Sequence, residues 1–384
     1  MAESSDFPAA ADIVKRPLPA YVRTALVLAF LYLFLGGVKL LESGIKGLGK
    51  DFTDALFENA SNPLAGLFVG ILATVLVQSS SVTTATIVGL VAAGVVDVQT
   101  AVPMIMGANI GTTVTNTLVS LAHARNDDAF KRGFAAATMH DFFNLMAVIV
   151  ILPLEILTGF ISSAASAVAR FISGGTELGG SFDSPIKGAV SWLAGVFQSL
   201  FEIFTGSETA LAVIAIVTGI GLIFLTLTLI TRNMRVLVAD RVERTLNAAL
   251  ARSSLVGIVV GMLITIAVQS SSITTSILIP LAASGLLAVR NAYPITLGAN
   301  IGTTVTALLA ALGAGALDGL TIAVTHTLFN IAGILLIFPW PKIKYIPVQL
   351  AEGLAEIAVK RKWLALAYVG VVFLGIPLLG IVVL

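Results

Sequence analysis

The stretch Val77–Ala85 reads VQSSSVTTA, and Val268–Ser276 reads VQSSSITTS, with seven of nine positions identical at an offset of 191 residues. The same offset relates Gly107–Thr115 to Gly298–Thr306, both of which read GANIGTTVT. The first QSSS lies in an apolar stretch, residues 62–96, that holds no charged residue. Two copies of one polar motif at a single spacing indicate an internal repeat whose halves contribute to one binding site.

The composition places the chain in a membrane. Of its 384 residues, 57% are hydrophobic and 11% are charged, and the mean hydropathy is +1.00. Soluble proteins carry about 25% charged residues, so we expect an all-α polytopic membrane protein. The net charge of +1 says nothing about nucleic acid, and the absence of cysteine excludes disulfides and thiolate metal sites. The sequence has no nucleotide loop, HExxH or nucleophile elbow, so we expect neither an enzyme nor a bound cofactor.

Short apolar arms flank each QSSS motif. They span Pro63–Val77 and Val82–Val96 in the first half, and Leu255–Val268 and Ile273–Leu287 in the second. Each arm has about 15 residues, whereas a helix that crosses a membrane needs roughly 20. Two short helices that meet at a polar tip predict a re-entrant hairpin, whose tip must be buried in protein or line a wet cavity.

A glycine-rich motif follows each hairpin. It lies within Thr100–Leu121 in the first half and Ala292–Leu312 in the second. Gly107 and Gly111 flank Asn109 and permit local unwinding, so we expect two broken helices whose free carbonyls and threonine hydroxyls face an ion. The alternative is that these glycines only allow close helix packing.

A third pair of motifs lies in the spans Gly133–Leu152 and Thr321–Phe338. Residues 140–144 read HDFFN and residues 326–330 read HTLFN. Histidine and asparagine at i and i+4 share one helix face. Asp141 has only Thr327 as its counterpart, so one half alone offers a carboxylate at membrane depth, where an ionisable group indicates function. We expect Asp141 to hold an additional cation or a proton; the alternative is a structural pair with His140.

Charged loops predict the topology. Arg232–Arg252 and Lys342–Lys362 each carry five basic residues, which places both loops on the cytoplasmic side. The acidic connection 42–62 then lies outside, so the two repeats enter the membrane from opposite faces. This is the inverted repeat of many secondary transporters. The N-terminus is expected to be cytoplasmic and the C-terminus outside.

The sequence thus predicts an inverted-repeat secondary transporter with two re-entrant helical hairpins and two broken helices. Its expected parts are a disordered tail (1–21), a first span and connection (22–62), repeat 1 (63–153), linking spans with a basic loop (154–252), repeat 2 (253–340), and a basic interfacial segment with the last span (341–384).

The hairpin tips offer hydroxyls, amides and helix N-termini without fixed charge. Helix N-termini bind oxyanions, and neutral oxygens also suit hard cations. The alternative is that serine and threonine only hold helices together in lipid.

Together these motifs resemble the type II sodium–phosphate cotransporters and their bacterial homologues. The resemblance covers 62–154 and 255–377 and implies sodium-driven phosphate uptake through the QSSS regions, helped by the NIGTT residues. Electrogenic members carry aspartate at the HDxFN position, so Asp141 implies a third sodium ion. The phosphate candidates are Gln78, Ser79, Ser80, Ser81, Asn109, Gln269, Ser270, Ser271, Ser272 and Asn300. The sodium candidates are Gln78, Ser81, Thr112, Thr113, Asp141, Asn144, Gln269, Ser272, Thr303, Thr304 and Asn330.

The expected partners are inorganic phosphate, sodium ions and the lipid of the cell (inner) membrane, with no nucleic acid; a homodimer is left open. Three alternatives also remain open. The same fold could carry sulfate or a carboxylate, the protein could be an anion channel, or it could be a membrane adaptor that transports nothing.

Overall fold

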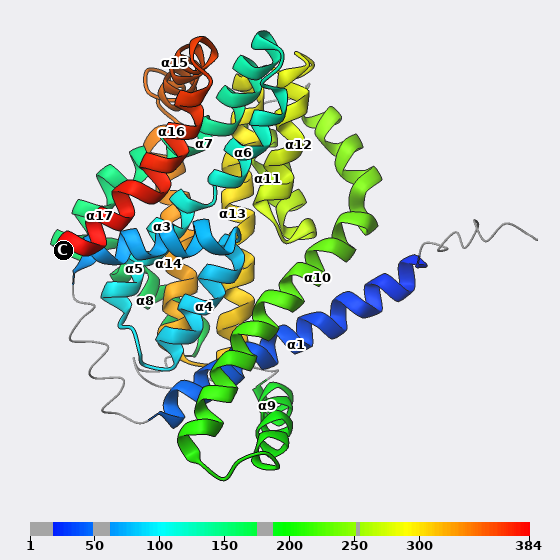
Figure 1. Cartoon of the computed structure of the whole chain (residues 1–384), viewed down its shortest axis with the longest axis vertical. Helices are drawn as coiled ribbons and strands as arrows, with labels where there is room; N and C mark the ends of the chain where they lie inside the picture. The colour runs from blue at the N-terminus through cyan, green and yellow to red at the C-terminus, as the bar shows by residue number, and fades with distance from the viewer. Residues whose placement is uncertain (1–17, 49–61, 175–186, 251–253) are drawn as a thin grey trace, which may run out of the picture.

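The computed structural model describes residues 18–48, 62–174, 187–250 and 254–384, and no strand occurs among them (Figure 1). Six helical segments in this part of the chain are long and apolar enough to cross a membrane, which confirms an all-α polytopic membrane protein. Five of them are α1 (Ala20–Gly47), α7 (Asp127–Thr158), the first part of α10 (Glu208–Leu250), α13 (Val289–Ala314) and α14 (Leu317–Ile337). The sixth is the last span, which consists of α16 (Trp363–Gly370), the π-helix η2 (Val371–Gly375) and α17 (Ile376–Val383).

Both hairpins form as the repeat predicts. The first consists of α3 (Pro63–Val77) and α4 (Ser80–Ala92), with 15 and 13 residues, and the second of α11 (Ser254–Val268) and α12 (Ser271–Ala283), also with 15 and 13. None of these arms reaches the roughly 20 residues of a spanning helix. In the first hairpin, Asn62 caps α3 by accepting a hydrogen bond from the backbone N–H of Leu64 at 2.9 Å.

The expectation of two broken helices is half wrong. In repeat 1 the chain forms α5 (Val98–Gly111) and α6 (Val114–Ser120), interrupted only at Thr112 and Thr113. In repeat 2 the matching helix, α13, continues without interruption through the whole GANIGTT motif.

The motif glycines serve close packing instead. A Cβ atom on Gly107 would collide with the carbonyl oxygen of Leu67 in α3, and one on Gly298 would collide with that of Ile258 in α11. Each hairpin therefore lies with one arm directly against the backbone of the helix that follows it. Because glycine has no side chain, the backbones of two helices can lie in contact. Close packing therefore accounts for Gly298, where α13 is continuous.

The two halves interlock at their far ends. The guanidinium of Arg132, near the start of α7, donates hydrogen bonds to the carbonyl oxygens of Ala282 and Ala283 at the end of α12. At the opposite end of the molecule, Gly319 of α14 packs against Ala92 at the end of α4. Figure 1 shows α12 in the upper part of the molecule and α4 in the lower part. This arrangement agrees with hairpins that enter from opposite sides.

The linking region, 154–252, departs in part from the sequence-based prediction. It begins with the end of α7 at Thr158 and continues with two short helices, α8 (Phe160–Ile172) and α9 (Lys187–Glu202), of 13 and 16 residues. Most of the expected basic loop, Arg232–Arg252, is a continuation of α10 to Leu250. Most of the expected N-terminal tail and most of the acidic connection lie outside the described residues.

An amphipathic helix, α15 (Ile346–Lys360), lies against α7 and buries Val348, Ala351 and Ala355. The Lys131 ammonium lies 2.8 Å from the Glu356 carboxylate, and its hydrogen bond holds the pKa of Glu356 below its ordinary value. The expected interfacial segment therefore exists as a helix attached to the start of α7.

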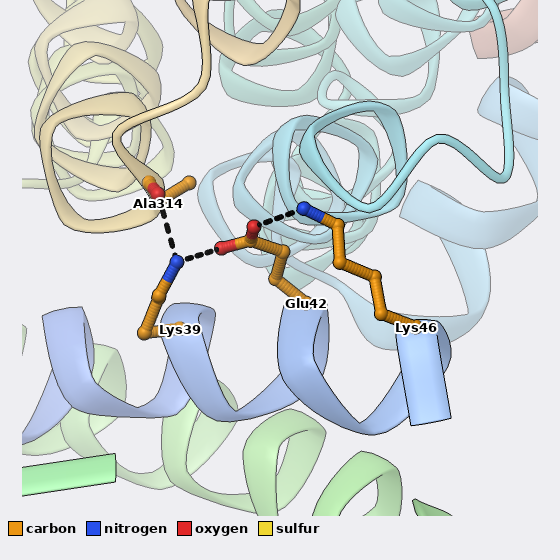
Figure 2. A network of polar contacts seen from close by, with 4 residues as sticks. All are labelled: Lys39, Glu42, Lys46 and Ala314. Atoms are coloured by element: carbon orange, nitrogen blue, oxygen red, sulfur yellow. Dashed lines mark hydrogen bonds and ion pairs between the residues drawn. The ribbon is translucent and has the colours of Figure 1, made fainter. Parts of the chain in front are cut away.

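A buried ion-pair cluster attaches α1 to repeat 2 (Figure 2). Glu42 is 3% exposed and accepts hydrogen bonds from the ammonium groups of Lys39 and Lys46, each at 2.7 Å. Lys39 also donates to the carbonyl oxygen of Ala314 at 3.4 Å, at the end of α13. A cation at this position satisfies a free carbonyl and complements the helix dipole, so Glu42 orients the side chain that holds the two helices together.

We expect Gly298→Ala to lower the melting temperature of the detergent-purified protein. Forcing α13 away from the carbonyl of Ile258 is an overpacking change that costs about 1–3 kcal/mol. The control is Gly221→Ala, because a Cβ at Gly221 meets no atom within 4 Å. Equal melting temperatures for the two variants would contradict close packing as the role of Gly298.

We also expect Glu42→Ala to destabilise the protein by about 1–3 kcal/mol, because Lys39 loses its buried partner. Thermal unfolding measures the loss, and Glu356→Ala is the control, since its ion pair with Lys131 is exposed. A loss at Glu42 no larger than at Glu356 would show that the cluster does not hold α1 to α13.

Candidate functional site

The two QSSS tips meet at one open cavity of about 180 Å³. The structure thus brings together two segments that lie 191 residues apart in the sequence. Among the residues that the structure describes, no charged side chain lines the cavity. Its lining consists of Gln78, Ser79, Ser80, Ser81, Gln269, Ser270, Ser271 and Ser272 from the tips, and Leu227, Thr228 and Thr231 from α10.

The glutamines shape the two tips in the same way. Gln78 and Gln269 have φ angles of 56° and 57°, the left-handed conformation that non-glycine residues seldom adopt. Their side-chain oxygens accept hydrogen bonds from the hydroxyls of Thr115 at 3.0 Å and Thr306 at 3.1 Å. Their amide nitrogens donate to the carbonyls of the arms that precede them. Each glutamine is therefore held by its own arm and by the helix that carries the GANIGTTVT motif.

The first serine of each motif begins the second arm. Ser79 accepts a hydrogen bond from the backbone N–H of Val82, and Ser270 accepts one from Ile273, both at 3.3 Å. These two serines are N-caps, so each hydroxyl oxygen accepts one hydrogen bond and keeps its O–H proton to donate. The next two serines of each motif form no side-chain hydrogen bond within the described chain. The hydroxyls of all six serines can therefore donate at the cavity, beside two helix N-termini, and all of these groups are neutral.

A second polar cluster is buried away from this cavity and joins the two repeats. The His140 imidazole Nε2 lies 2.6 Å from the Asn300 side-chain oxygen, and the Asn300 amide donates to the Asn144 side-chain oxygen at 2.9 Å. The Asn144 amide donates to the carbonyl of Asn109 at 2.8 Å. Because the Asn300 oxygen is an acceptor, His140 must carry its proton on Nε2 in this arrangement.

The structure distributes the predicted site residues over several places. The QSSS residues line the cavity, whereas Asn109, Asn144 and Asn300 belong to the buried cluster. The hydroxyls of four buried threonines donate to nearby backbone carbonyls; they are Thr112, Thr113, Thr303 and Thr304. The Thr304 oxygen also accepts a hydrogen bond from Thr327. Asn330 is buried with its side-chain oxygen unpaired.

Asp141 does not pair with His140, the alternative that its sequence position left open. One carboxylate oxygen, Oδ2, accepts a hydrogen bond from the hydroxyl of Tyr368 at 2.8 Å. The other oxygen, Oδ1, is buried and has no hydrogen-bond partner. The side chain of Thr113, at the interruption between α5 and α6, lies beside the carboxyl group. A buried carboxylate oxygen without a donor is suited to a cation or a proton.

Sequence reasoning missed several residues at these sites. Thr115 and Thr306 were visible as the last residues of the duplicated motif, but only the fold shows that they hold the glutamines. Thr228 and Thr231 have no counterpart in the repeat, so no pattern marked them. Tyr368 reaches Asp141 from a helix outside both repeats.

We expect Asn300→Ala to lower stability by about 2–5 kcal/mol, because buried groups of His140 and Asn144 each lose a partner. The matched control is Asn330→Ala, because Asn330 donates only to His326 of its own helix, and we expect a loss of about 1 kcal/mol there. Thermal unfolding in detergent compares them. Equal losses would show that the bonds of Asn300 do not hold the two repeats together.

Comparison with known proteins identifies a family to which this chain is similar. The model of the Na+/Pi-cotransporter family matches residues 33–232 and 222–380. The bovine sodium-dependent phosphate transport protein 2B is 34% identical over 92% of this chain and 64% of its own length. The rat protein 2A is 36% identical over 93% and 67%, and the human protein 2B is 32% identical over 93% and 64%. No solved structure gave a significant match.

The chain thus spans about two thirds of the length of these relatives. The family model covers both repeats, including both QSSS tips and the helices that hold them. On the extent of these matches, the chain is a member of the Na+/Pi-cotransporter family.

Proposed function

We propose that this protein is a sodium-coupled symporter that imports inorganic phosphate across the cell membrane by alternating access. The observation that carries the proposal is the cavity where the two QSSS tips meet, lined by symmetry-related neutral oxygens and nitrogens. Membership of the Na+/Pi-cotransporter family supports the choice of ions.

Phosphate is assigned to the tips. The hydroxyls of Ser80, Ser81, Ser271 and Ser272 line the cavity and can donate to phosphate oxygens. The free N–H groups in the first turns of α4 and α12 add two positive dipole ends. Asn109 and Asn300, which the sequence suggested as phosphate ligands, are assigned a supporting role. The Asn109 amide donates to the carbonyl of Ile105 in its own helix, and the Asn300 amide donates to Asn144 in the buried cluster.

Sodium provides the positive charge that the cavity lacks. No lysine or arginine of the described chain lines the cavity, so a phosphate anion bound there needs cations nearby. In a low-dielectric site the attraction between the two is strong. Each ion then binds poorly without the other. This mutual dependence is a reciprocal coupling free energy between the sites, and it is what a symporter requires.

The sodium ligands are assigned to buried oxygens next to the tips. Gln78, Gln269, Ser81 and Ser272 can share sodium with the phosphate, and the buried threonine pairs 112–113 and 303–304 add hydroxyl oxygens. Asp141 is assigned an additional cation because its Oδ1 has no other partner. The matching Thr327 is neutral, so only repeat 1 holds an additional cation. The positive charge of that cation crosses the membrane with the other ions and makes transport electrogenic.

The orientation follows from the charges. The basic residues near α15 and at the end of α10 place these ends in the cytoplasm. The N-terminus is then cytoplasmic, and the C-terminus lies outside the cell.

The test is uptake of radioactive phosphate into proteoliposomes with an imposed sodium gradient. We expect accumulation above equilibrium, and a KM for phosphate raised about tenfold or more in the double variant Ser80→Ala/Ser271→Ala, because hydrogen bonds to a charged ligand are lost. The control is Ser284→Ala, an exposed serine whose hydroxyl bonds a carbonyl of its own helix.

The alternatives give different results in the same vesicles. Competition by arsenate but not by sulfate or succinate supports phosphate as the substrate, and the reverse contradicts it. Flux without accumulation would indicate a channel. An unchanged KM in the double variant would remove the tip serines from the phosphate site.

A further inference from the structure

The last span of the chain reaches the carboxylate of Asp141. The Tyr368 hydroxyl, on α16, donates a hydrogen bond to Asp141 Oδ2 at 2.8 Å. Asp141 is 4% exposed and its other oxygen has no partner. Neither lysine, arginine nor histidine forms an ion pair with this carboxylate in the described chain. Two hydroxyl side chains therefore lie at this carboxylate when no cation is bound, Thr113 beside it and Tyr368 with a hydrogen bond to Oδ2.

The second repeat shows what the same position does without a carboxylate. Thr327, the counterpart of Asp141, donates to the hydroxyl of Thr304 at 3.0 Å. Thr304 is the counterpart of Thr113, which lies beside Asp141. In repeat 2 these two side chains bond each other, whereas in repeat 1 the carboxylate takes a further donor, Tyr368, from a helix outside the repeat.

The span that carries Tyr368 contains an irregular turn and has few residues buried inside the protein. Three residues after the tyrosine it turns into a π-helix, Val371–Gly375, a feature frequent at functional sites. Only 11% of the apolar window of this span is buried inside the protein. The Tyr368 ring packs edge-on against Phe373, with ring centroids 5.9 Å apart. Further on, Gly380 packs against Phe68 of the first hairpin.

We propose that Tyr368 is a positioning residue that occupies Asp141 in the cation-free protein and competes with the cation that binds there. The proposal rests on the proposed function in one respect, that a cation binds at Asp141. Because the same span contacts both Asp141 and the first hairpin, release of Tyr368 links occupation of this cation site to the position of a phosphate tip.

Competition follows from the chemistry of the two partners. The phenol O–H on Oδ2 partly offsets the negative charge of the buried carboxylate, and a sodium ion at the unpaired Oδ1 draws on that same charge. A cation that takes both oxygen atoms displaces the hydrogen bond, and one that takes Oδ1 alone weakens it. The hydrogen bond is therefore strongest in the cation-free state, and what is lost on binding lowers the affinity for the cation.

The experiment measures sodium binding without phosphate. Purified protein in detergent is titrated with sodium chloride, with choline chloride keeping the ionic strength constant, and thermal stabilisation reports binding. We expect Tyr368→Phe to lower the half-saturating sodium concentration roughly tenfold, since the lost hydrogen bond is to a charged group. The control is Tyr32→Phe, because the Tyr32 hydroxyl donates to the carbonyl of Ala189, away from this site.

A second pair of variants tests the route of the effect. In an Asp141→Asn background, Tyr368→Phe should leave the sodium response unchanged. An unchanged or weaker affinity in Tyr368→Phe alone would overturn the proposal; so would the same shift in the Asp141→Asn background, or wild-type protein that does not respond to sodium. Phosphate plays no part in this titration, so its failure is separate from a failure of phosphate uptake.

Discussion

A helix that ends inside a membrane leaves backbone N–H and carbonyl groups without partners, and lipid cannot supply them. Both hairpins contain such ends, at Gln78–Ser79 and at Gln269–Ser270. The protein satisfies part of the need locally through the serine N-caps and the glutamine side chains. The remaining groups face the cavity between the tips, where water or a ligand can reach them. The same requirement that shapes the hairpins thus creates a place for an anion.

The two halves are alike at the tips and different around them. Gln78–Thr115 and Gln269–Thr306 are equivalent bonds with nearly equal lengths. By contrast, α5 and α6 are interrupted where α13 is continuous, and Asp141 stands opposite a neutral threonine. The hydrogen bonds between His140, Asn300 and Asn144 cross from one half to the other. A duplicated chain has kept its symmetry where the substrate is proposed to bind and lost it where the additional cation is proposed.

Duplication made the tips predictable from the sequence. A motif that recurs at one offset reveals both the arms and the meeting of their ends, and the structure brings the eight QSSS residues to one cavity. The glycines misled the prediction because the same residue permits either unwinding or close contact, and only the neighbouring carbonyls of Leu67 and Ile258 decide between them. Thr228, Thr231 and Tyr368 could not be found, since they come from helices without a repeat partner.

The glycine contacts also determine which parts of the protein can move separately. Because α3 lies against α5 and α11 against α13 at backbone contact distance, sliding either pair would drive carbonyl oxygens into neighbouring backbone. Each tip is therefore carried as a single solid piece with its supporting helix. The α10 wall of the cavity, with Thr228 and Thr231, belongs to neither piece and packs along α1. If the proposed transport cycle opens this cavity, a displacement of the α10 wall would open it while the ligands on each tip keep their geometry.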